Sequence, residues 1–391
     1  MEKNYLLDTG SFPKELHLLL AFIRMENDNN PLVDLKLQTV DVNWGYFIKL
    51  ARHHRVYPLV YINLKRWNID IVPAEVEKAL YVEYCKNTFQ MLKLTSETVN
   101  ICKLFEGHKI NSILLKGPVL AADLYGDQSL RTSKDIDILI SIDNVDKVEQ
   151  VLLTAGYILN QKNPRIMNDW KWNIHHLTYF HPQKNIEIEI HWRLDPDPGR
   201  EPLFAELWQR RNMCYISGYP VPMLGREDLF FYLICHGARH GWFRLRWIAD
   251  IDRLTKQTMD WEKVNYLLEK YHSKQIGGQA LILSLGLLHS PLKPEMRSLV
   301  TGNLPLKLAQ SAVVFIKDTI NFSKLPNDLV IYYRRYLFSL KSNSQKWLYL
   351  IGQLYPNARD AKTLPLPNYL HFLYFPLRPV LWFWRRLKQQ V

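Results

Sequence analysis

Two short segments of the chain alternate acidic residues with isoleucine. They are SKDIDILISI at residues 133–142 and IEIEIHW at residues 186–192. Because successive side chains of a β-strand point to opposite faces, each segment predicts a strand with isoleucines on one face and polar groups on the other. The polar faces would carry Asp135, Asp137, Glu187, Glu189 and His191. This pattern constrains the fold most, because it requires a sheet with one buried side and one acidic side.

The two acidic faces predict a metal site if the strands are neighbours in the sheet. Carboxylates that lie side by side repel each other unless a cation lies between them, and a divalent cation is the strongest such partner. Asp135, Asp137 and Glu189, with help from Glu187, would then hold two Mg²⁺ ions, or Mn²⁺, as two-metal phosphoryl-transfer sites do. A DxD pattern alone more often marks a solvent-exposed strand edge than a metal site. The second acidic strand is what favours the metal site here.

The residues around these strands predict a small mixed sheet. Short apolar runs that end in glycine or alternate with polar residues indicate strands, and apolar residues at helical spacing indicate helices. The expected elements are a strand at 110–116, a helix at 118–125, a strand at 136–142, a helix at 144–154 stopped by Gly156, and an antiparallel hairpin of strands at 175–181 and 186–192.

Helical segments flank the sheet on both sides. Residues 14–110 read as helical, and the proline-rich cluster DPDPGREP at 195–202 predicts a boundary. The helices expected beyond it are 226–236, 246–255, 261–271, 277–288, 306–321 and 328–340. The predicted fold class is therefore α+β. An N-terminal helical region (1–109) and a C-terminal helical region (199–391) enclose a mixed-sheet core at 110–198.

Glycine and proline begin the predicted helix before the first acidic strand. Gly117 permits close approach of a ligand, and Pro118 is preset for the first helical position. The free N–H groups of such a helix start would face an anion. Lys116, Arg131 and Lys134 add positive charge beside it, so we expect this group to bind the phosphates of a nucleotide. The alternative is an ordinary strand-to-helix turn.

The composition is strongly basic. The net charge of +12 predicts attraction to polyanions, without choosing among nucleotides, nucleic acid, anionic lipid and acidic peptides. No leader sequence or run of membrane-spanning length is recognisable. The four cysteines are widely spaced, which favours reduced, buried thiols over a disulfide framework or a zinc ribbon. We therefore expect a cytoplasmic protein.

Two further segments carry weaker signals. His236 and His240, with Asp250 and Asp252, are an alternative metal set, although local hydrogen bonds explain such histidines more often. A substrate-facing role is expected instead for His191, Arg239, His240 and Asp250.

The C-terminal part of the chain is aromatic and basic. The tail at 369–388 suits a membrane interface, but its prolines favour packing on the helical domain over peripheral membrane contact. The stretch at 331–338 reads either as a nucleic-acid contact or as a helix with tyrosines inside and arginines outside.

LKGPVLAADLY (115–125), Arg131, DIDILI and EIHW together resemble the uncharacterised nucleotidyltransferases of the DNA polymerase β-like superfamily. The resemblance extends to LARHHRVYPLV (50–60), HGARHGWFRLRWIADIDRL (236–254) and LPLPNYLHFLYFPLRPV (364–380). It implies metal binding by Asp135 and Asp137, a third carboxylate at Glu189, and nucleotide contact around Lys116 and Gly117. The Gly117-Pro118 pair lies farther from Asp135 than the glycine pair of the wider superfamily does from its first aspartate.

The predicted activity is transfer of a nucleoside monophosphate from a nucleoside triphosphate, with ATP as the expected donor, to a hydroxyl or phosphate acceptor. The resemblance points to a peptide or sugar acceptor, because similar members accompany lasso-peptide and polysaccharide biosynthesis. Nucleic acid, as in tRNA-type relatives, is the alternative acceptor. A non-catalytic nucleotide-binding scaffold is the alternative from another class.

Overall fold

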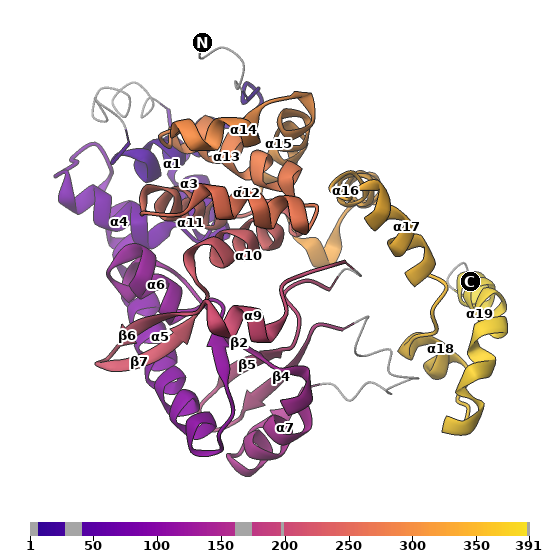
Figure 1. Ribbon diagram of the computed structural model, residues 1–391. Coiled ribbons are helices and arrows are strands. Elements are labelled where there is room, and N and C mark those ends of the chain that lie inside the picture. Colours follow the sequence, from indigo (N-terminus) through magenta and orange to yellow (C-terminus); the bar gives the residue numbers. More distant parts are fainter. Residues whose placement is uncertain (1–6, 28–40, 161–173, 197–198, 389–391) are drawn as a thin grey trace.

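The computed structural model places a mixed sheet beside two groups of helices (Figure 1). The strand order is β3-β4-β5-β2-β1-β7-β6. The structure describes residues 7–27, 41–160, 174–196 and 199–388. This arrangement confirms the predicted α+β fold class.

The N-terminal helices form one continuous packed group, as the sequence predicts. They are α1 (Lys14–Arg24), α3 (Trp44–His53), α4 (Tyr57–Arg66) and α5 (Ala74–Gly107). In α1 the apolar residues Leu16, Leu19 and Leu20 recur at helical spacing and are buried. The long helix α5 contacts both α4 and the sheet, so it joins the helical region to the strands that carry the site (Figure 1).

The isoleucines of the two acidic strands lie in the core. These strands are β2 (Asp135–Ile140) and β5 (Ile186–His191), and they pair in parallel. Ile136, Ile138, Ile188 and Ile190 are all buried, as the alternation predicts. The neighbouring strands are β1 (Ser112–Leu114), β3 (Ile158–Leu159) and β4 (His176–His181), and helix α7 (Val145–Thr154) follows β2. The hairpin of β4 and β5 is antiparallel, also as predicted.

A second hairpin extends the sheet beyond its expected end. After α9 (Phe204–Gln209), strands β6 (Asn212–Ile216) and β7 (Tyr219–Met223) pair with each other, and β7 runs parallel to β1. The strands therefore reach residue 223, beyond the core predicted at 110–198. The region around DPDPGREP has neither helix nor strand in its described residues, which agrees with a break there. The division of the chain into three regions stays a prediction.

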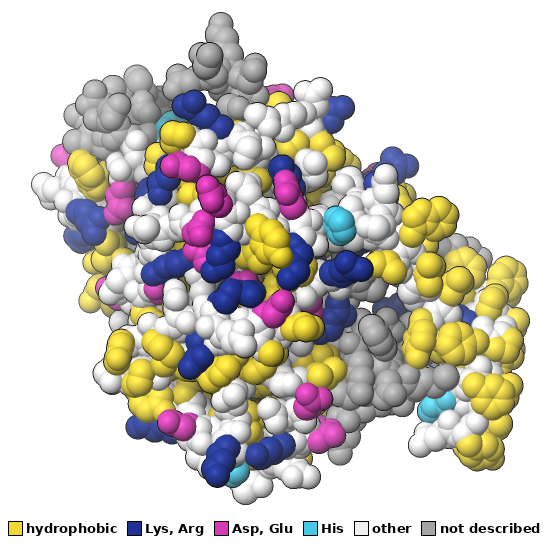
Figure 2. Space-filling view, viewed as in Figure 1, with side chains coloured by type: hydrophobic (Ala, Val, Ile, Leu, Met, Phe, Trp, Pro, Cys, Tyr) yellow, Lys and Arg dark blue, Asp and Glu magenta, His cyan; other side chains and the backbone are white. Residues whose placement is uncertain are grey.

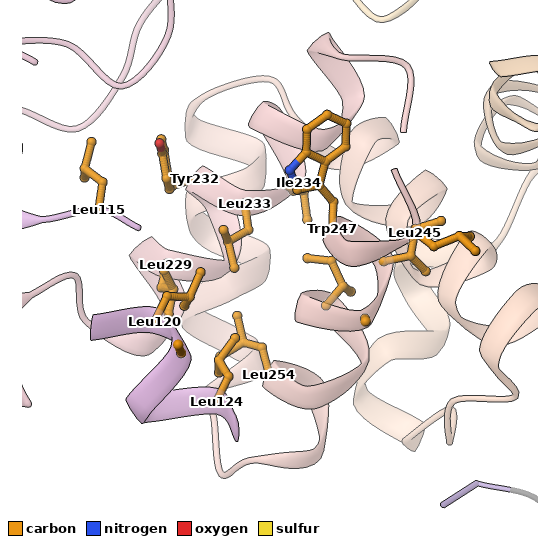
Figure 3. Packing of buried hydrophobic residues seen from close by; sticks show 14 of the residues in the cluster. Leu115, Leu120, Leu124, Leu229, Tyr232, Leu233, Ile234, Leu245, Trp247 and Leu254 are labelled. Carbon is orange, nitrogen blue, oxygen red and sulfur yellow. The ribbon is translucent and has the colours of Figure 1, made fainter. Parts of the chain in front are cut away.

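The start of α6 (Pro118–Tyr125) is fixed by apolar packing against the helical body. Figure 3 shows Leu120 and Leu124 of α6 beside Leu229 of α10 and Leu254 of α11. The body consists of α10 (Arg226–Arg239), α11 (Leu245–Lys256), α12 (Trp261–Lys270), α13 (Lys274–Leu288), α14 (Arg297–Val300) and α15 (Asn303–Ile316). Burial of these leucines, each worth about 1.5–3 kcal/mol, holds α6 against α10 and α11.

The C-terminal segment is only partly attached to this body. Helix α16 (Asn327–Ser339) is docked on α10, because Tyr336 Oη donates to the Ala238 carbonyl at 3.0 Å. Beyond it lie α17 (Asn343–Gly352), α18 (Ala358–Thr363) and α19 (Tyr374–Lys388). Tyr374 and Leu381 form a small cluster of their own. The expectation that the tail packs on the helical domain is therefore wrong for these residues, because Tyr374 and Leu381 pack against Ala361, Leu366 and Leu377 of the C-terminal segment itself.

Two smaller expectations have mixed outcomes. The stretch at 331–338 is helical, with Tyr336 buried and Arg334 and Arg335 exposed. All four cysteines are free, but Cys85 is exposed, which corrects the expectation of buried thiols throughout.

No single described helix has the length and apolar character needed to cross a membrane. One pair bent by 80°, 294–300 with α15, meets those criteria when its halves are taken together.

Candidate active site

The register of β2 and β5 brings the acidic residues together. Asp135 lies opposite Glu187, and Asp137 lies opposite Glu189. Ligand atoms of Asp135, Glu187 and Glu189 lie within 4.8 Å of one another, and so do those of Asp137, Glu189 and His191. The two groups share Glu189. The carboxylates thus form one continuous acidic cluster on the polar face of the sheet.

Asp137 is the most buried member of this cluster. Lys116 Nζ lies 2.9 Å from Asp137 Oδ1, and His191 Nε2 lies 3.2 Å from the same oxygen. Burial alone would raise the pKa of Asp137, but Lys116 and His191 outweigh it and hold that pKa well below its usual range. The carboxylate is therefore ionised inside the protein. Burial would also lower the pKa of Lys116, yet Asp137 raises it.

The outer carboxylates repel each other. Burial raises the pKa of Glu187, and the charges of Asp135 and Glu189 raise it further. Asn160 Nδ2 donates to Glu187 Oε2 at 3.2 Å, and Ser133 Oγ donates to the Asp135 carbonyl at 3.1 Å. These contacts orient the cluster but add no cation to it.

The donor set fits a divalent metal. Asp137 Oδ2 and His191 Nδ1 are buried and have no hydrogen-bond partner among the described residues. A buried carboxylate oxygen without a partner is costly unless something outside the protein chain binds it. Hard oxygen donors beside it are those that Mg²⁺ and Mn²⁺ prefer. Asp135, Asp137, Glu187 and Glu189 are therefore chemically suited to such ions.

Gly117 lies directly against the acidic strand. Its φ of +82° is a conformation that side chains disfavour, and a Cβ there would lie 3.3 Å from the Asp135 carbonyl oxygen. Helix α6 begins at the next residue, and no side chain caps its first turn. The N–H groups of that turn thus have no side-chain acceptor, at a position beside the carboxylates.

Arg131 and Asp250 pair with each other. Arg131 Nε and Nη2 each donate to an Asp250 carboxylate oxygen at 2.9 Å, and Tyr125 Oη donates to Asp250 Oδ1 at 2.8 Å. Both members of the pair are buried. A bidentate pair of this kind joins the approach to β2 with α11. The expected contacts of Arg131 with phosphate and of Asp250 with substrate stay predictions. Lys134 is exposed just before Asp135.

Arg239 and His240 have different surroundings. Arg239 Nη1 lies 3.4 Å from His175 Nε2, so this arginine reaches the histidines beside the acidic cluster. His240 stacks on Trp247 with ring centroids 5.3 Å apart, and burial lowers the pKa of His240 to about 3. Among the described residues, the groups that could hold a metal include neither His236 nor His240. The alternative metal set has no support.

His175 and His176, just before and at the start of β4, were not predicted as site residues from the sequence. His176 lies opposite His191 in the hairpin, with ring centroids 4.9 Å apart. His176 Nε2 lies 3.8 Å from Glu189 Oε1, and burial and His191 lower the pKa of His176 to about 4. The hairpin register contained this signal, because the two histidines begin a strand that was predicted to pair with IEIEIHW.

One family model matches residues 41–288, and it describes an uncharacterised nucleotidyltransferase. The match covers more than half of the chain and includes both acidic strands and the start of α6. The chain belongs to this family. The protein is accordingly a nucleotidyltransferase, and the enzyme class predicted from the sequence is confirmed.

Two solved structures were also found to be similar to this nucleotidyltransferase. A lincosamide antibiotic adenylyltransferase, LnuA, in its lincomycin-bound form, is 20% identical with a TM-score of 0.28, covering 35% of this chain and 83% of its own. An antigenic nucleotidyltransferase-like protein from Paracoccidioides brasiliensis is 14% identical with a TM-score of 0.30, covering 51% of this chain and 94% of its own. None of the curated proteins compared matches the chain.

The nucleotidyltransferase also carries an arginine cluster, Arg55, Arg244 and Arg246, that the sequence analysis missed. Burial and Arg244 lower the pKa of Arg55 to about 10, and burial and Arg246 lower that of Arg244 to about 10. Burial, Arg131 and Arg55 lower the pKa of Arg246 to about 9. In the described part of the chain no carboxylate forms an ion pair with any of the three. Such a group of desolvated cations is stabilised by an anion.

Proposed function

We propose that this nucleotidyltransferase moves a nucleoside monophosphate from a nucleoside triphosphate to a hydroxyl or phosphate acceptor and releases pyrophosphate. The observation that carries the proposal is the in-register pairing of β2 and β5. It puts Asp135, Asp137 and Glu189 on one face, beside the uncapped start of α6. Acidic ligands for cations next to donors for phosphate are what nucleotidyl transfer requires.

The acidic cluster would hold the metals. Asp135 and Asp137 would bind the ion that accompanies the triphosphate, and Glu189, with Glu187, would complete a second site. Two Mg²⁺ ions, or Mn²⁺, would lower the pKa of the acceptor hydroxyl and offset the charge on pyrophosphate when bound.

The residues around the cluster would bind and orient the triphosphate. Lys116, Gly117, Arg131 and Lys134 are the proposed phosphate contacts from the sheet side. The arginine cluster supports a second set on the helical side, because Arg246 is buried, Arg55 and Arg244 are half-buried, and none of the three forms an ion pair with a described carboxylate. Charges fixed in advance on both sides of a phosphate chain stabilise the developing negative charge without reorganisation.

The bond changes balance without a further reactant. The acceptor oxygen forms a bond to the α-phosphorus, and the bond from that phosphorus to the bridging oxygen breaks. Pyrophosphate leaves with the electron pair. The acceptor proton passes to the Glu189 carboxylate, whose two oxygens lie beside His176 and His191. These histidines are suited to hold Glu189 in place during the step.

The acceptor is proposed to be a peptide or a sugar. The reaction would belong to natural-product or polysaccharide tailoring, such as lasso-peptide biosynthesis. It would take place in the cytoplasm with ATP as donor. A nucleic-acid acceptor is the alternative that the basic composition favours. A non-catalytic scaffold is disfavoured because the carboxylates of both strands are complete. A scaffold would bind nucleotide tightly without turnover over any acceptor panel.

Pyrophosphate release from the four common nucleoside triphosphates, with and without Mg²⁺, tests the proposal. Glu189→Gln should reduce Mg²⁺-dependent release at least about 100-fold, since loss of a metal ligand removes several kcal/mol of transition-state stabilisation. Asp137→Asn should abolish it. Asp143→Asn, an exposed change just beyond β2, is the control. Undiminished release by correctly folded Glu189→Gln would contradict the proposal.

A further inference from the structure

A cavity of about 700 Å³ lies between the helical body and the docked C-terminal helices. Its walls come from α10, the turn between α12 and α13, the start of α13, the segment after β5, α16 and α17. Three tyrosine hydroxyls fix the α16 wall: those of Tyr333 and Tyr336 donate to α10 carbonyls, and that of Tyr332 donates to the Ser311 carbonyl. The cavity is therefore a built feature of the fold and has the size of a small-ligand site.

Most of the lining side chains are apolar or aromatic. They include Phe231, Tyr271, Ile276, Leu337, Phe338 and Leu350. Such a surface gains free energy by covering apolar groups of a ligand, at about 25 cal/mol per Å². A neutral sugar would cover little of this apolar surface, because hydroxyl groups lie along most of its length. A polynucleotide needs an extended basic track with stacking platforms, which a cavity of this size does not offer.

Among the described lining residues, positive charge exceeds negative charge. The basic ones are Arg200, Arg239, Arg334, Arg335 and Lys341, and the acidic ones are Asp195 and Glu201. Arg193 Nε and two backbone N–H groups already occupy the Glu201 carboxylate, at 2.9–3.1 Å. Within the described ranges no carboxylate pairs with Arg334 or Arg335. The surplus suits a ligand that carries an anionic group.

Arg239 connects the cavity to the acidic cluster. It lines the cavity, and its Nη1 lies 3.4 Å from His175 Nε2. His175 Nε2 in turn lies 3.0 Å from His176 Nδ1, and His176 faces Glu189. Arg239 Nε is buried and has no hydrogen-bond partner among the described residues. Arg239, His175 and His176 thus form a chain of side-chain contacts from the cavity wall to Glu189.

We infer that this cavity binds the acceptor, and that the acceptor is a short apolar peptide segment with a free carboxylate. The inference rests on the proposed function and narrows its acceptor class. Apolar side chains of the peptide cover the aromatic walls, and Arg334 and Arg335 bind the carboxylate. The hydroxyl that receives the nucleotide then lies on the Arg239 side.

Fluorescence anisotropy with labelled tetrapeptides tests the inference without any turnover. The probes combine leucine, isoleucine, phenylalanine and tyrosine, carry fluorescein at the N-terminus, and end either in a carboxylate or in an amide. The full-length protein should bind the best carboxylate peptide about tenfold or more tightly than its amide, because charge-assisted hydrogen bonds are lost with the carboxylate. Replacing the large side chains of the peptide by glycine should also weaken binding.

Two double variants that remove the same charge show whether the peptide carboxylate binds at Arg334 and Arg335. Arg334→Gln with Arg335→Gln should weaken binding of the carboxylate peptide about tenfold and leave the amide unchanged. Arg297→Gln with Lys307→Gln, two exposed changes on α14 and α15, should have little effect. Both pairs remove the same charge, so a general loss of electrostatic attraction would affect them equally.

Three outcomes would overturn the inference. They are absence of binding across the peptide set, equal affinity for carboxylate and amide, and displacement of the peptide by a neutral trisaccharide or by octathymidylate but not by unlabelled peptide. Mg²⁺-dependent pyrophosphate release is measured separately. If release depends on Glu189 but no peptide binds, the proposed function stands and the acceptor assignment fails. If peptide binds but Glu189 is irrelevant to release, the proposed function fails.

Discussion

At the scale of single residues, Lys116 and Asp137 form the centre of the proposed site. The Asp137 side chain is fully buried, and Lys116 is 13% exposed, so each needs the other in the absence of a metal. Removing one partner of a buried ion pair typically costs about 3–5 kcal/mol, because the remaining charge is left without compensation. A divalent cation at the carboxylate would supply that compensation instead.

Lys116→Met should therefore destabilise the protein by about 3 kcal/mol in the absence of divalent metal. Mg²⁺ should restore a larger part of the stability of this variant than it adds to the wild type. Denaturant unfolding with and without Mg²⁺ measures both quantities. Lys134→Met, which changes an exposed lysine before β2, is the control and should shift stability by less than about 0.5 kcal/mol. An equal response of both lysine variants to Mg²⁺ would contradict the placement of the metal.

For the arginine cluster we expect that removing a charge, unlike Lys116→Met, does not destabilise the protein. Arg244→Gln removes one of three neighbouring cations, of which Arg246 is buried and Arg55 and Arg244 are half-buried, so it should not lower stability. It should weaken binding of nucleoside triphosphates at least about tenfold. Calorimetric titration with ATP, GTP, CTP and UTP in the presence of Mg²⁺ measures the affinity. Arg52→Gln, in the same region but half-exposed and paired with Glu83, is the control. Unchanged affinity in Arg244→Gln would remove the cluster from the site.

At the scale of elements, local pattern predicts β2, β5 and α6, because alternation and the Gly-Pro start are properties of short segments. It does not predict β6 and β7, since NMCYI and YPVPM lack an acid-apolar alternation and prolines argue against a strand between two others. Local pattern does not predict the arginine cluster either. Arg55 follows α3 and Arg244 precedes α11, and only tertiary packing brings them together.

The hydrogen bonds of the Glu97 carboxylate in α5 predict how the stability of the protein depends on pH. Tyr157 Oη and Lys184 Nζ both donate to Glu97 Oε1 at 2.6 Å, joining α5 to the edge of the sheet. Burial alone would raise the pKa of Glu97, but these hydrogen bonds lower it below its ordinary value of 4.5. The contribution to stability is thus complete above pH 4.5 and is lost as the pH falls through the lowered pKa.

Glu97→Gln should therefore cost about 1–3 kcal/mol of unfolding free energy at pH 7. The difference from the wild type should shrink as the pH falls from about 4.5 through the lowered pKa, because the unfolded chain takes up its proton first and the folded carboxylate is protonated only at lower pH. Urea unfolding at a series of pH values measures this. Glu262→Gln, an exposed change on α12, should show no such pH dependence. A constant difference between wild type and Glu97→Gln at all pH values would show that ionisation of Glu97 is not responsible.

At the scale of the whole molecule, the C-terminal segment has a different surface from the rest. Figure 2 shows apolar side chains gathered on the segment that extends to the right, where α17 and α19 lie. Trp347, Tyr369 and Phe383 are exposed by 68%, 77% and 59%. A monomer rarely exposes so many large apolar groups in one region without a contact surface there. Together with the net charge of +12, this suits peripheral contact with anionic lipid.

Co-sedimentation with vesicles of phosphatidylcholine and phosphatidylserine tests that contact. The protein should sediment with the anionic vesicles, and Trp347→Ser with Phe383→Ser should reduce the bound fraction several-fold, because about 1.5–3 kcal/mol is lost per large apolar side chain. Tyr81→Ser with Phe89→Ser, on the exposed face of α5, is the matched control. Binding that is unaffected by the tail variant but reduced by the control would place the lipid contact elsewhere.

The most direct test of the central claim is a count of the metal ions held by the acidic cluster. Electron paramagnetic resonance titration with Mn²⁺ in the presence of a non-hydrolysable ATP analogue needs no knowledge of the acceptor. We expect two bound ions per chain in the wild type. Glu189→Gln should lose at least one of them, and Asp143→Asn should keep both. Two ions that persist in Glu189→Gln, or no bound ion in the wild type, would contradict this expectation.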